Sequence, residues 1–326
     1  MDRLDPSDRR LLDEFQRAFP LVARPFAVLG DALDLTEDTV IARLARLQAA
    51  GTVARVGGTV RPNTAGASTL AALAVPEARI DAVAAIVSEE PGVNHSYLRE
   101  DDWNLWFVAT APDAKGLAAS LAQIGARTGL QVLSLPLLHA FNIDLGFRLT
   151  GSRAALSTDA PVDETALKTT DRPLLQAMAV GLPLVPQPFA ALATDLGWSE
   201  AQVLDRLARL SYARILTRIG VIVRHRAIGW AANAMVVWDV AGTEIEAAGC
   251  ALAAVPGVTL CYQRQTVPGL WRYGLFSMIH GQSRADALTV LDAARALPAL
   301  ATTDHRILFS TRCFKQTGAL LERTAA

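Results

Sequence analysis

The chain has 326 residues, 51% of them hydrophobic, and a net charge of −1 from 31 basic and 32 acidic residues. The length predicts more than one domain, and the lack of a basic excess argues against a protein that works mainly on nucleic acid. No stretch reaches the roughly 18 to 20 unbroken apolar residues of a membrane span, and the charged N-terminus does not resemble a signal peptide, so we expect a cytoplasmic protein without membrane partners.

Residues 1–65 carry the pattern of a winged helix-turn-helix domain. Apolar residues at helical spacing predict two short helices, separated by a proline-containing break at 20–25. Thr36 is a good N-cap for a third helix, "TEDTVIARLARLQAAG" (36–51). The alternating segment "TVARVGGTVR" (52–61) follows and predicts a β-hairpin, the wing of such a domain.

From residue 69 the hydrophobic periods change to the order strand, helix, strand, strand, helix, strand. The six segments are "LAALAV" (70–75), "ARIDAVAAIVSE" (78–89), "VNHSYLR" (93–99), "WNLWFVAT" (103–110), "DAKGLAASLAQIGART" (113–128) and "LQVLSLPL" (130–137). This is the order of the ferredoxin-like βαββαβ fold, and we assign residues 66–150 to such a domain.

The whole unit is repeated. When Asp8 is laid on Asp171, 24 of 54 positions are identical without a gap. The later segments recur as "AMVVWDV" (234–240), "EIEAAGCALAAV" (244–255), "TLCYQR" (259–264), "YGLFSMIH" (273–280), "RADALTVLDAARAL" (284–297) and "HRILFS" (305–310). We therefore assign a second winged helix-turn-helix to 167–228 and a second ferredoxin-like domain to 229–326, after a surface linker at 151–166. The fold class is α+β, a tandem duplication whose halves we expect to be related by a pseudo-two-fold axis.

The two copies differ at residues that titrate near neutral pH. In "PGVNHSYLR" (91–99) and "PGVTLCYQR" (256–264) the tyrosine and the arginine recur. When the two segments are aligned, however, His95 of the first copy corresponds to Leu260 of the second. His280, on a later strand, also has no histidine counterpart. The duplication therefore predicts two similar halves that are chemically unequal.

A helix-turn-helix unit followed by a βαββαβ domain resembles the Lrp/AsnC family of transcriptional regulators. Within that superfamily, "HSYLREDDWNLWFV" (95–108), "CYQRQTVPGLWRYGLFSMIHG" (261–281) and "LFSTRCFKQT" (308–317) resemble siroheme decarboxylases, with the two subunits fused end to end. The resemblance implies removal of CO2 from the two acetate side chains on rings C and D of siroheme, giving didecarboxysiroheme in heme d1 biosynthesis. It also implies that no separate cofactor is needed, because siroheme, the substrate, carries the iron.

Siroheme is a flat macrocycle edged with eight carboxylates, so its site needs apolar and aromatic walls and several arginines. Strand residues two apart share a face, so His95, Tyr97 and Arg99 project together, as Tyr262 and Arg264 do in the second copy. The candidate substrate-binding residues are Arg99, Arg264, Tyr97, Tyr262, Trp103, Tyr273, Arg224, Arg61, Arg312 and Lys315. The alternative is a core face with an arginine that reaches the surface at its end.

The predicted wings also carry repeated arginines: Arg55, Arg61, Arg218 and Arg224. The wing of the first domain can close over a ligand held below it. Ordinary solvated charge is the alternative interpretation.

Loss of CO2 from an acetate on a pyrrole leaves a methyl group, so a proton must reach the carbon that loses CO2. A histidine is the natural donor near neutral pH. His280 and His95 are the catalytic candidates, and we expect the larger kinetic effect from His280, whose strand ends beside Gly281. A role of His280 as an iron ligand is also open. The three cysteines have no metal-like spacing, so no metal site of the protein itself is expected.

A ligand-responsive DNA-binding regulator is the main alternative function. The third predicted helix of each copy carries repeated arginines: Arg43, Arg46, Arg206 and Arg209. A reading helix needs several polar or basic groups aimed at bases and phosphates, whereas Ala, Leu and Val dominate here, so we expect DNA binding to be lost or vestigial. A tetrapyrrole carrier, a third reading, would keep the pocket without needing the histidines. The sequence leaves both a monomer and a homodimer open.

Overall fold

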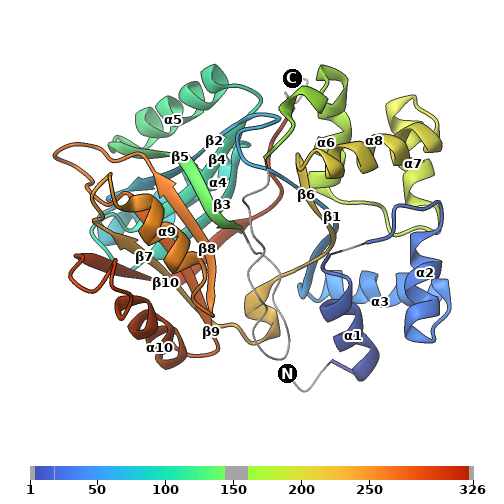
Figure 1. Ribbon diagram of the computed structural model, residues 1–326. Helices are drawn as coiled ribbons and strands as arrows, with labels where there is room; N and C mark the ends of the chain where they lie inside the picture. Colours follow the sequence, from blue (N-terminus) through green and yellow to red (C-terminus); the bar gives the residue numbers. More distant parts are fainter. Residues whose placement is uncertain (1–3, 18, 144–160, 323–326) are drawn as a thin grey trace.

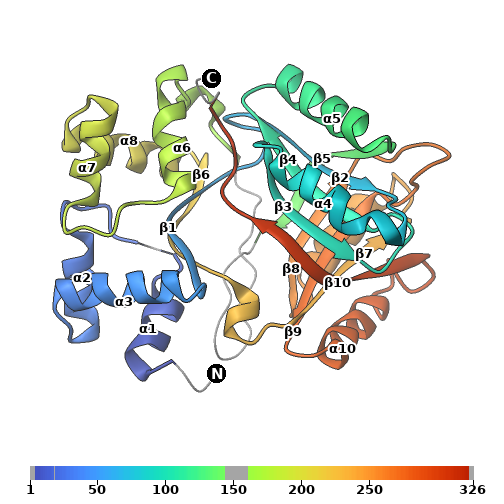
Figure 2. The same ribbon diagram turned by 180° about the vertical axis from the view of Figure 1, so that it is seen from behind.

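The computed structural model describes residues 4–17, 19–143 and 161–322. The molecule has two lobes (Figure 1): a helical lobe with the first three α-helices of each copy, and a barrel lobe with most of the strands and the other α-helices. Seen from behind, the C-terminal segment runs from the barrel to the helical lobe (Figure 2). None of the described helices combines the length and the apolar character that crossing a membrane requires.

Six α-helices build the helical lobe. They are α1 (Pro6–Glu14), α2 (Pro25–Leu33) and α3 (Glu37–Ala49) from the first copy, and α6 (Arg172–Val180), α7 (Pro188–Leu196) and α8 (Glu200–Tyr212) from the second. Thr36 caps α3 as predicted, because its hydroxyl accepts a hydrogen bond from the Thr39 amide at 3.2 Å. Buried residues of both copies form one apolar core, which includes Leu11, Phe26, Leu44, Leu174, Phe189 and Leu207. The two helical units therefore share a single core.

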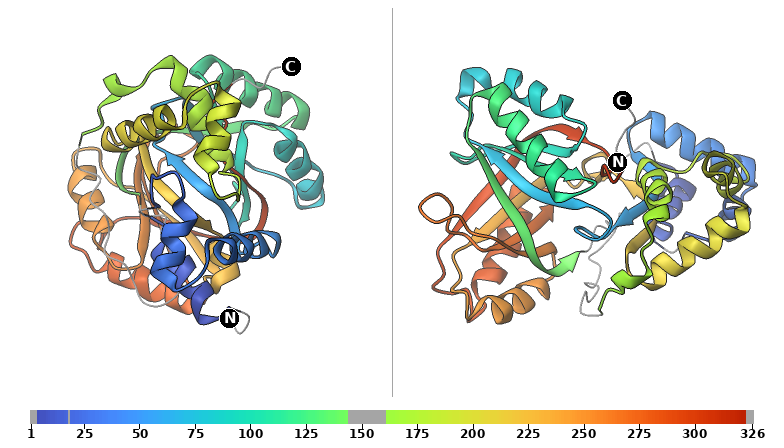
Figure 3. Two further views of the ribbon diagram at one scale, coloured as in Figure 1. Left: turned by 90° about the vertical axis from the view of Figure 1, so that its right-hand side faces the viewer. Right: turned by 90° about the horizontal axis from the view of Figure 1, so that it is seen from above.

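The predicted wing hairpins are wrong. Each wing is one strand, and β1 (Val53–Val60) pairs antiparallel with β6 (Leu216–Val223), so that Gly57 lies opposite Gly220. A hairpin would need a turn near these glycines, but the backbone at Gly57 stays outside the left-handed region. A Cβ on Gly57 would lie 2.5 Å from the carbonyl oxygen of Met178. The glycine therefore serves the close approach of helix to strand. Figure 3 shows this two-stranded ribbon between the lobes.

The barrel lobe contains six segments from each copy, in the predicted order strand, helix, strand, strand, helix, strand. The first copy supplies β2 (Ala67–Leu73), α4 (Ile80–Glu89), β3 (Val93–Arg99), β4 (Leu105–Ala111), α5 (Ala114–Thr128) and β5 (Val132–Ile143). The second copy supplies β7 (Ala232–Trp238), α9 (Ile245–Ala253), β8 (Val258–Arg264), β9 (Leu275–Gly281), α10 (Arg284–Arg295) and β10 (His305–Gln316). The strands close into a barrel in the order β10-β3-β4-β2-β5-β8-β9-β7.

Two seams join the copies in this barrel. The last strand of each copy, β5 or β10, is 12 residues long and extends past its own sheet. There β5 pairs with β8, and β10 pairs with β3, both antiparallel. The predicted last strands, 130–137 and 305–310, end earlier than the observed ones, and the added residues are those that form the seams.

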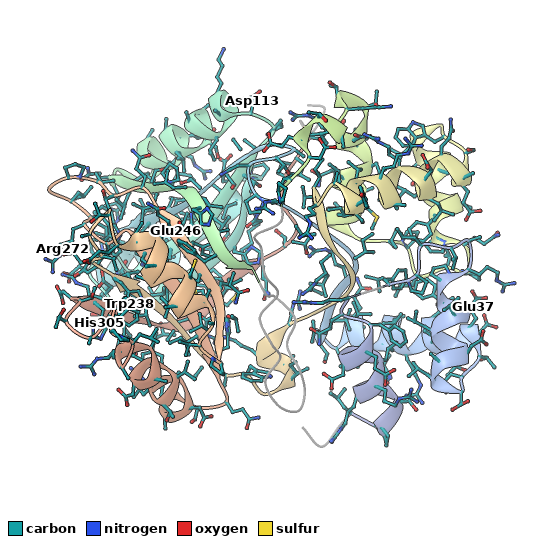
Figure 4. All side chains as sticks on the ribbon, viewed as in Figure 1. Glu37, Asp113, Trp238, Glu246, Arg272 and His305 are labelled. Carbon is teal, nitrogen blue, oxygen red and sulfur yellow. The ribbon has the colours of Figure 1, made fainter. Side chains whose placement is uncertain are left out.

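Helices α4, α5, α9 and α10 cover the outside of the barrel (Figures 1 and 3). Inside, aromatic residues fill one end, where the ring of Trp271 lies 5.2 Å from those of Trp106 and Tyr273. Figure 4 shows the neighbouring Arg272 at the edge of the molecule that faces away from the helical lobe. The far end of the barrel is therefore plugged, and its open space lies toward the helical lobe.

Most of the linker predicted at 151–166 lies outside the described residues. Its described part contains the 3-10 helix η2 (Glu164–Ala166). The other 3-10 helices are η1 (Glu77–Arg79), η3 (Thr169–Asp171) and η4 (His225–Ile228).

Candidate active site

A cavity of about 380 Å³ lies inside the mouth of the barrel. Its walls come from barrel strands of both copies, from the β1–β6 ribbon of the helical lobe and from the segment after β10. The volume is in the range of small-molecule sites. The two copies thus contribute to one shared chamber.

The permanently charged residues that line this cavity are all basic. Five arginines line it: Arg55, Arg61, Arg99, Arg218 and Arg264. Among the described residues that line it there is no aspartate or glutamate. An excess of guanidinium groups in a concave, partly apolar site favours a ligand with several carboxylates or phosphates.

Arg99 and Arg264 are held deep in the barrel by polar groups without charge. Arg99 Nη1 donates to Asn233 Oδ1 at 3.1 Å and to the Leu308 carbonyl at 3.0 Å. Arg264 Nη1 donates to the Leu135 carbonyl at 3.0 Å. Among the described residues, the hydrogen-bond partners of both arginines are uncharged, and the Nε of each is buried without a partner. Burial lowers the pKa of both to about 10, which leaves them charged at neutral pH and short of an anion.

Two tyrosines flank these cations at equivalent positions. The guanidinium carbon of Arg99 lies 5.6 Å from the centre of the Tyr97 ring, and that of Arg264 lies 5.3 Å from the Tyr262 ring. Burial raises the pKa of both phenols above its ordinary value, so they stay protonated. The predicted pairing of an aromatic ring and a cation is therefore present in both copies.

His95 lines the same cavity as Tyr97 and the ribbon residue Arg55. Its ring stacks on Tyr97 with the centres 6.4 Å apart, and its Nδ1 is 2.7 Å from Asn94 Oδ1. Because an amide oxygen only accepts, Nδ1 carries the proton, and Nε2 has no hydrogen-bond partner among the described residues. Burial, and after it the charge of Arg55, lowers the pKa of His95 to about 4. The ring is therefore neutral at pH 7 in the free protein.

His280 lies in the same cavity but is bound by the protein on both ring nitrogens. Nε2 is 2.8 Å from Asn233 Nδ2, and Nδ1 is 2.8 Å from Thr259 Oγ1. The side chain is 5% exposed. Because both ring nitrogens already have protein partners, this geometry favours a positioned histidine over a proton donor to the substrate.

Arg55 and Arg218, which lie outside the predicted set of substrate-binding residues, line the cavity from the β1–β6 ribbon. Burial lowers the pKa of Arg55 and of Arg61, which also lines the cavity. The signal that identifies them is their recurrence at matching positions of the two copies. The ribbon thus covers the mouth of the barrel, as expected of the first wing, although it is built by two strands from different copies.

Five predicted substrate-binding residues lie outside the lining of the cavity: Trp103, Tyr273, Arg224, Arg312 and Lys315. Trp103 and Tyr273 belong to the aromatic plug, because they lie at the far ends of their strands or just beyond them. The Arg224 guanidinium turns to the carbonyl of Gly51 at 3.4 Å.

The two remaining residues lie on β10, whose register with β3 shifts between Ser310 and Arg312 and again between Cys313 and Lys315, so simple alternation does not place them. Arg312 is exposed and pairs with Asp81 of α4 at 2.6 Å. Lys315 Nζ donates to the carbonyls of Ser88 at 2.7 Å and Glu90 at 3.0 Å. Neither points at the cavity.

The arginines that a DNA-binding regulator would use for reading DNA form ion pairs within the helical lobe. Arg43 and Arg46 both pair with Asp8, at 2.9 and 2.5 Å, and Asp8 is buried. In the second copy Arg206 pairs with the fully buried Asp171 at 2.5 Å. These helices present neutralised pairs where a reading helix would present free cations.

No group of three or more histidine, cysteine or acidic side chains suited to a metal ion occurs within 4–17, 19–143 and 161–322.

Family models match both domain types in each copy of the repeat. Residues 8–53 and 171–216 match a family model described as the siroheme decarboxylase NirDL-like HTH domain. Residues 65–142 and 227–315 match the AsnC-like ligand binding domain. The chain is thus a duplicated mixed α/β protein with a helix-turn-helix unit and an AsnC-like unit in each copy.

Similar proteins exist both as fused and as half-length chains. A siroheme decarboxylase NirDL subunit of Paracoccus pantotrophus is 63% identical over 324 residues, which cover 99% of each chain. A NirD subunit of Stutzerimonas stutzeri is 51% identical over 146 residues, covering 45% of this chain and 96% of that one. A crystal structure of the siroheme decarboxylase NirDL in co-complex with an iron-uroporphyrin III analogue is 27% identical and has a TM-score of 0.69, covering 97% of this chain and 95% of that one.

Proposed function

The chain belongs to the siroheme decarboxylase NirDL family, and we propose that it removes CO2 from the acetate side chains on rings C and D of siroheme, giving didecarboxysiroheme, in the cavity shared by its halves. The observation that carries this proposal is the set of five arginines in a cavity whose described lining contains no acidic residue. Eight carboxylates on a flat macrocycle supply the anions that Arg99 and Arg264 lack.

The reaction needs a proton and no oxidant. The bond between the carboxylate carbon and the methylene carbon breaks, CO2 leaves, and the electron pair stays on the methylene carbon, which the adjoining macrocycle stabilises. A proton then adds to this carbon and a methyl group results. We propose that the enzyme needs no cofactor of its own and that the iron belongs to the substrate.

The arginines and the reacting carboxylate have different roles in this proposal. A guanidinium bound to the leaving carboxylate would stabilise the ground state and slow the loss of CO2. We therefore assign Arg99, Arg264 and the ribbon arginines to carboxylates that do not react. The apolar part of the wall, with Leu260, Phe276 and Met278, is suited to desolvate the one that does.

We assign proton delivery to His95 first. In the free protein its pKa is about 4, because burial and Arg55 disfavour the charged ring. Substrate carboxylates beside it would raise this pKa toward neutral, since an opposite charge favours the imidazolium. His280, whose two ring nitrogens are already bound, is the weaker candidate, which reverses the order expected from sequence. A bond from His95 Nε2 to the iron is the competing role.

The test is anaerobic incubation of purified protein with siroheme, followed by mass and NMR analysis of the product. We expect loss of two CO2 units, one each from rings C and D. A product decarboxylated on rings A or B would contradict the ring assignment, and bound but unchanged siroheme would indicate a carrier. A new iron–histidine absorption band that disappears in His95→Ala would favour the ligand role.

We further propose that one chain holds a complete site, since the two seams leave β3 and β8 paired within the chain. A homodimer would then form through another surface, which light scattering can detect. Three free cysteines support a reducing compartment such as the cytoplasm. We also propose that each barrel half is a ferredoxin-like domain, spanning residues 66–150 and 229–326, after helix-turn-helix domains at 1–65 and 167–228.

A further inference from the structure

Asn233 of β7 lies between an arginine of β3 and a histidine of β9. Its Oδ1 is 3.1 Å from Arg99 Nη1, and its Nδ2 is 2.8 Å from His280 Nε2. All three side chains are buried, with 4 to 5% of each exposed. Asn233 therefore connects a cation of the cavity to a histidine of the cavity.

The direction of each hydrogen bond in this chain of contacts is fixed by Arg99. A guanidinium only donates, so Asn233 must turn its oxygen to Arg99 and its amide hydrogens to His280. His280 Nε2 is then an acceptor, and the ring proton sits on Nδ1, which donates to Thr259 Oγ1 at 2.8 Å. The hydroxyl of Thr259 in turn donates to the Met278 carbonyl at 3.1 Å. Each of these hydrogen bonds, from Arg99 to the Met278 carbonyl, therefore has one donor and one acceptor.

The same contacts also decide which edge of Arg99 is available. Its Nη1 has two hydrogens, and Asn233 Oδ1 and the Leu308 carbonyl take both. Nε and Nη2 make no hydrogen bond to a described residue. These two atoms form the side of a guanidinium that binds a carboxylate through two parallel hydrogen bonds.

The first copy shows that the barrel does not need this arrangement. Asn233 pairs with His280 between β7 and β9, and the matching pair between β2 and β4 is Ser68 with Thr110. Ser68 Oγ instead hydrogen-bonds to Asn63 Oδ1 at 2.8 Å. The equivalent strand pair of the first copy thus forms without an amide and an imidazole. The folding of the barrel does not explain Asn233 and His280, which indicates a role for them in the cavity.

We infer that Asn233 is a positioning residue: it fixes His280 as the Nδ1-protonated tautomer and holds Arg99 so that its Nε and Nη2 face a substrate carboxylate. This inference rests on the proposed function for the identity of the carboxylate. Its first part, the tautomer, concerns the free protein alone.

The tautomer is tested by long-range 15N–1H NMR of the histidines in the ligand-free full chain at pH 7.5. We expect the Nδ1–H pattern for His280 in the wild type. Asn233→Asp should place a carboxylate against Nε2 and move a proton onto it, giving the pattern of a doubly protonated ring. A wild-type ring protonated on Nε2 overturns the inference, whatever the variants do.

The grip on substrate is tested with Asn233→Ser, which installs the residue of the first copy. We expect the dissociation constant for siroheme to rise about tenfold or more, with a smaller change in the single-turnover rate at saturation. Asn142→Ser is the matched control, because Asn142 is also buried and bonds to the Val258 carbonyl, but lies outside the lining of the cavity. Equal effects of the two variants on binding, or none from Asn233→Ser, would overturn the positioning role. A wild type that binds siroheme without releasing CO2 would reject the proposed function and leave both measurements valid.

Discussion

Arg99 and Arg264 occupy equivalent positions in the two halves, and each is anchored by the other half. Arg99 Nη1 donates to the Leu308 carbonyl of β10, and Arg264 Nη1 donates to the Leu135 carbonyl of β5, both at 3.0 Å. The last strand of each copy therefore orients the cation of its partner. Neither half alone would hold its arginine in the observed position.

This relationship predicts matched losses of binding. Arg99→Leu and Arg264→Leu should each weaken the binding of siroheme by about 1.5 to 3 kcal/mol, because each removes hydrogen bonds from a charged donor to a carboxylate. Absorbance titration of the macrocycle measures this. Arg312→Leu, which changes an exposed arginine outside the cavity, should leave the affinity unchanged. Unaltered binding in both cavity variants would refute the carboxylate grip.

Single-turnover experiments should show different effects of substituting His95 and His280. His95→Ala should slow CO2 release by about 10² to 10⁴, the usual contribution of a positioned acid, with siroheme still bound. His280→Ala should first weaken binding, because Asn233 then loses the partner that helps to orient it. Rates at saturating substrate, compared with dissociation constants, distinguish the two. The assignment fails if His280→Ala abolishes turnover at full binding while His95→Ala turns over normally.

His95 also predicts how stability depends on pH. Its pKa is about 4 in the folded protein, against an ordinary 6.5, so the unfolded chain binds more protons between these values. The free energy of unfolding of the ligand-free protein should therefore fall as the pH drops from 6.5 to 4, by at most about 3 kcal/mol from this residue. Urea unfolding at a series of pH values measures the slope. His95→Gln should flatten it, and an identical slope in both proteins would contradict the prediction.

The helical lobe should not bind DNA with sequence specificity. Arg43, Arg46 and Arg206 are paired with buried aspartates. Fluorescence anisotropy with its own promoter at physiological salt should show no sequence-dependent complex tighter than about 10⁻⁷ M, since non-specific binding lies at roughly 10⁻⁴ to 10⁻⁶ M. Asp8→Asn should release Arg46, while Arg43 keeps Asp5 as its acidic partner, and should strengthen non-specific binding. A specific nanomolar complex of the wild type would restore the regulator hypothesis.

Substitution of Gly57 should lower the stability of the fold, because the residue packs against α6. A methyl group there would lie 2.5 Å from the Met178 carbonyl oxygen, so Gly57→Ala should push the ribbon from α6 and lower the free energy of unfolding by about 1 to 3 kcal/mol. Gly242→Ala, where nothing lies within 4 Å of the added carbon, is the control. Urea unfolding compares the two variants. Equal stabilities would mean that the strand can move away at no cost.

The chain order of helices and strands was predictable because it depends on local periodicity, which the sequence carries directly. The pairing of β1 with β6 was not, since an alternating segment with two glycines fits a hairpin equally well. Gly57 leaves room for the Met178 carbonyl of α6, and Gly220 leaves room for the Gln16 carbonyl just after α1, both far away in the sequence. The seams were missed for the same reason: the end of a strand depends on whether a partner continues beyond its own sheet.

In the candidate site, alternation along β3 and β8 correctly grouped Tyr97 with Arg99 and Tyr262 with Arg264. Alternation does not say how deep along the barrel a residue lies, so Trp103 and Tyr273 were assigned to the cavity although they belong to the plug. The role of Asn233 could not be predicted from the sequence, because its partners Arg99 and His280 lie on β3 and β9, which are distant in the sequence. Comparing it with Ser68, its counterpart in the repeat, would have singled it out.

The seam between β3 and β10 has a consequence for how the protein is made. β3 is synthesised early, but its outer edge is paired by β10 of the second copy, a strand that ends at Gln316. At roughly 5 to 20 residues per second, that edge waits about 10 to 35 s after β5 has emerged from the ribosome. During this time a nascent chain exposes unpaired backbone that can recruit another chain. Chains truncated before residue 305 should therefore aggregate, because they lack β10, the strand of the second copy that completes the sheet of the first.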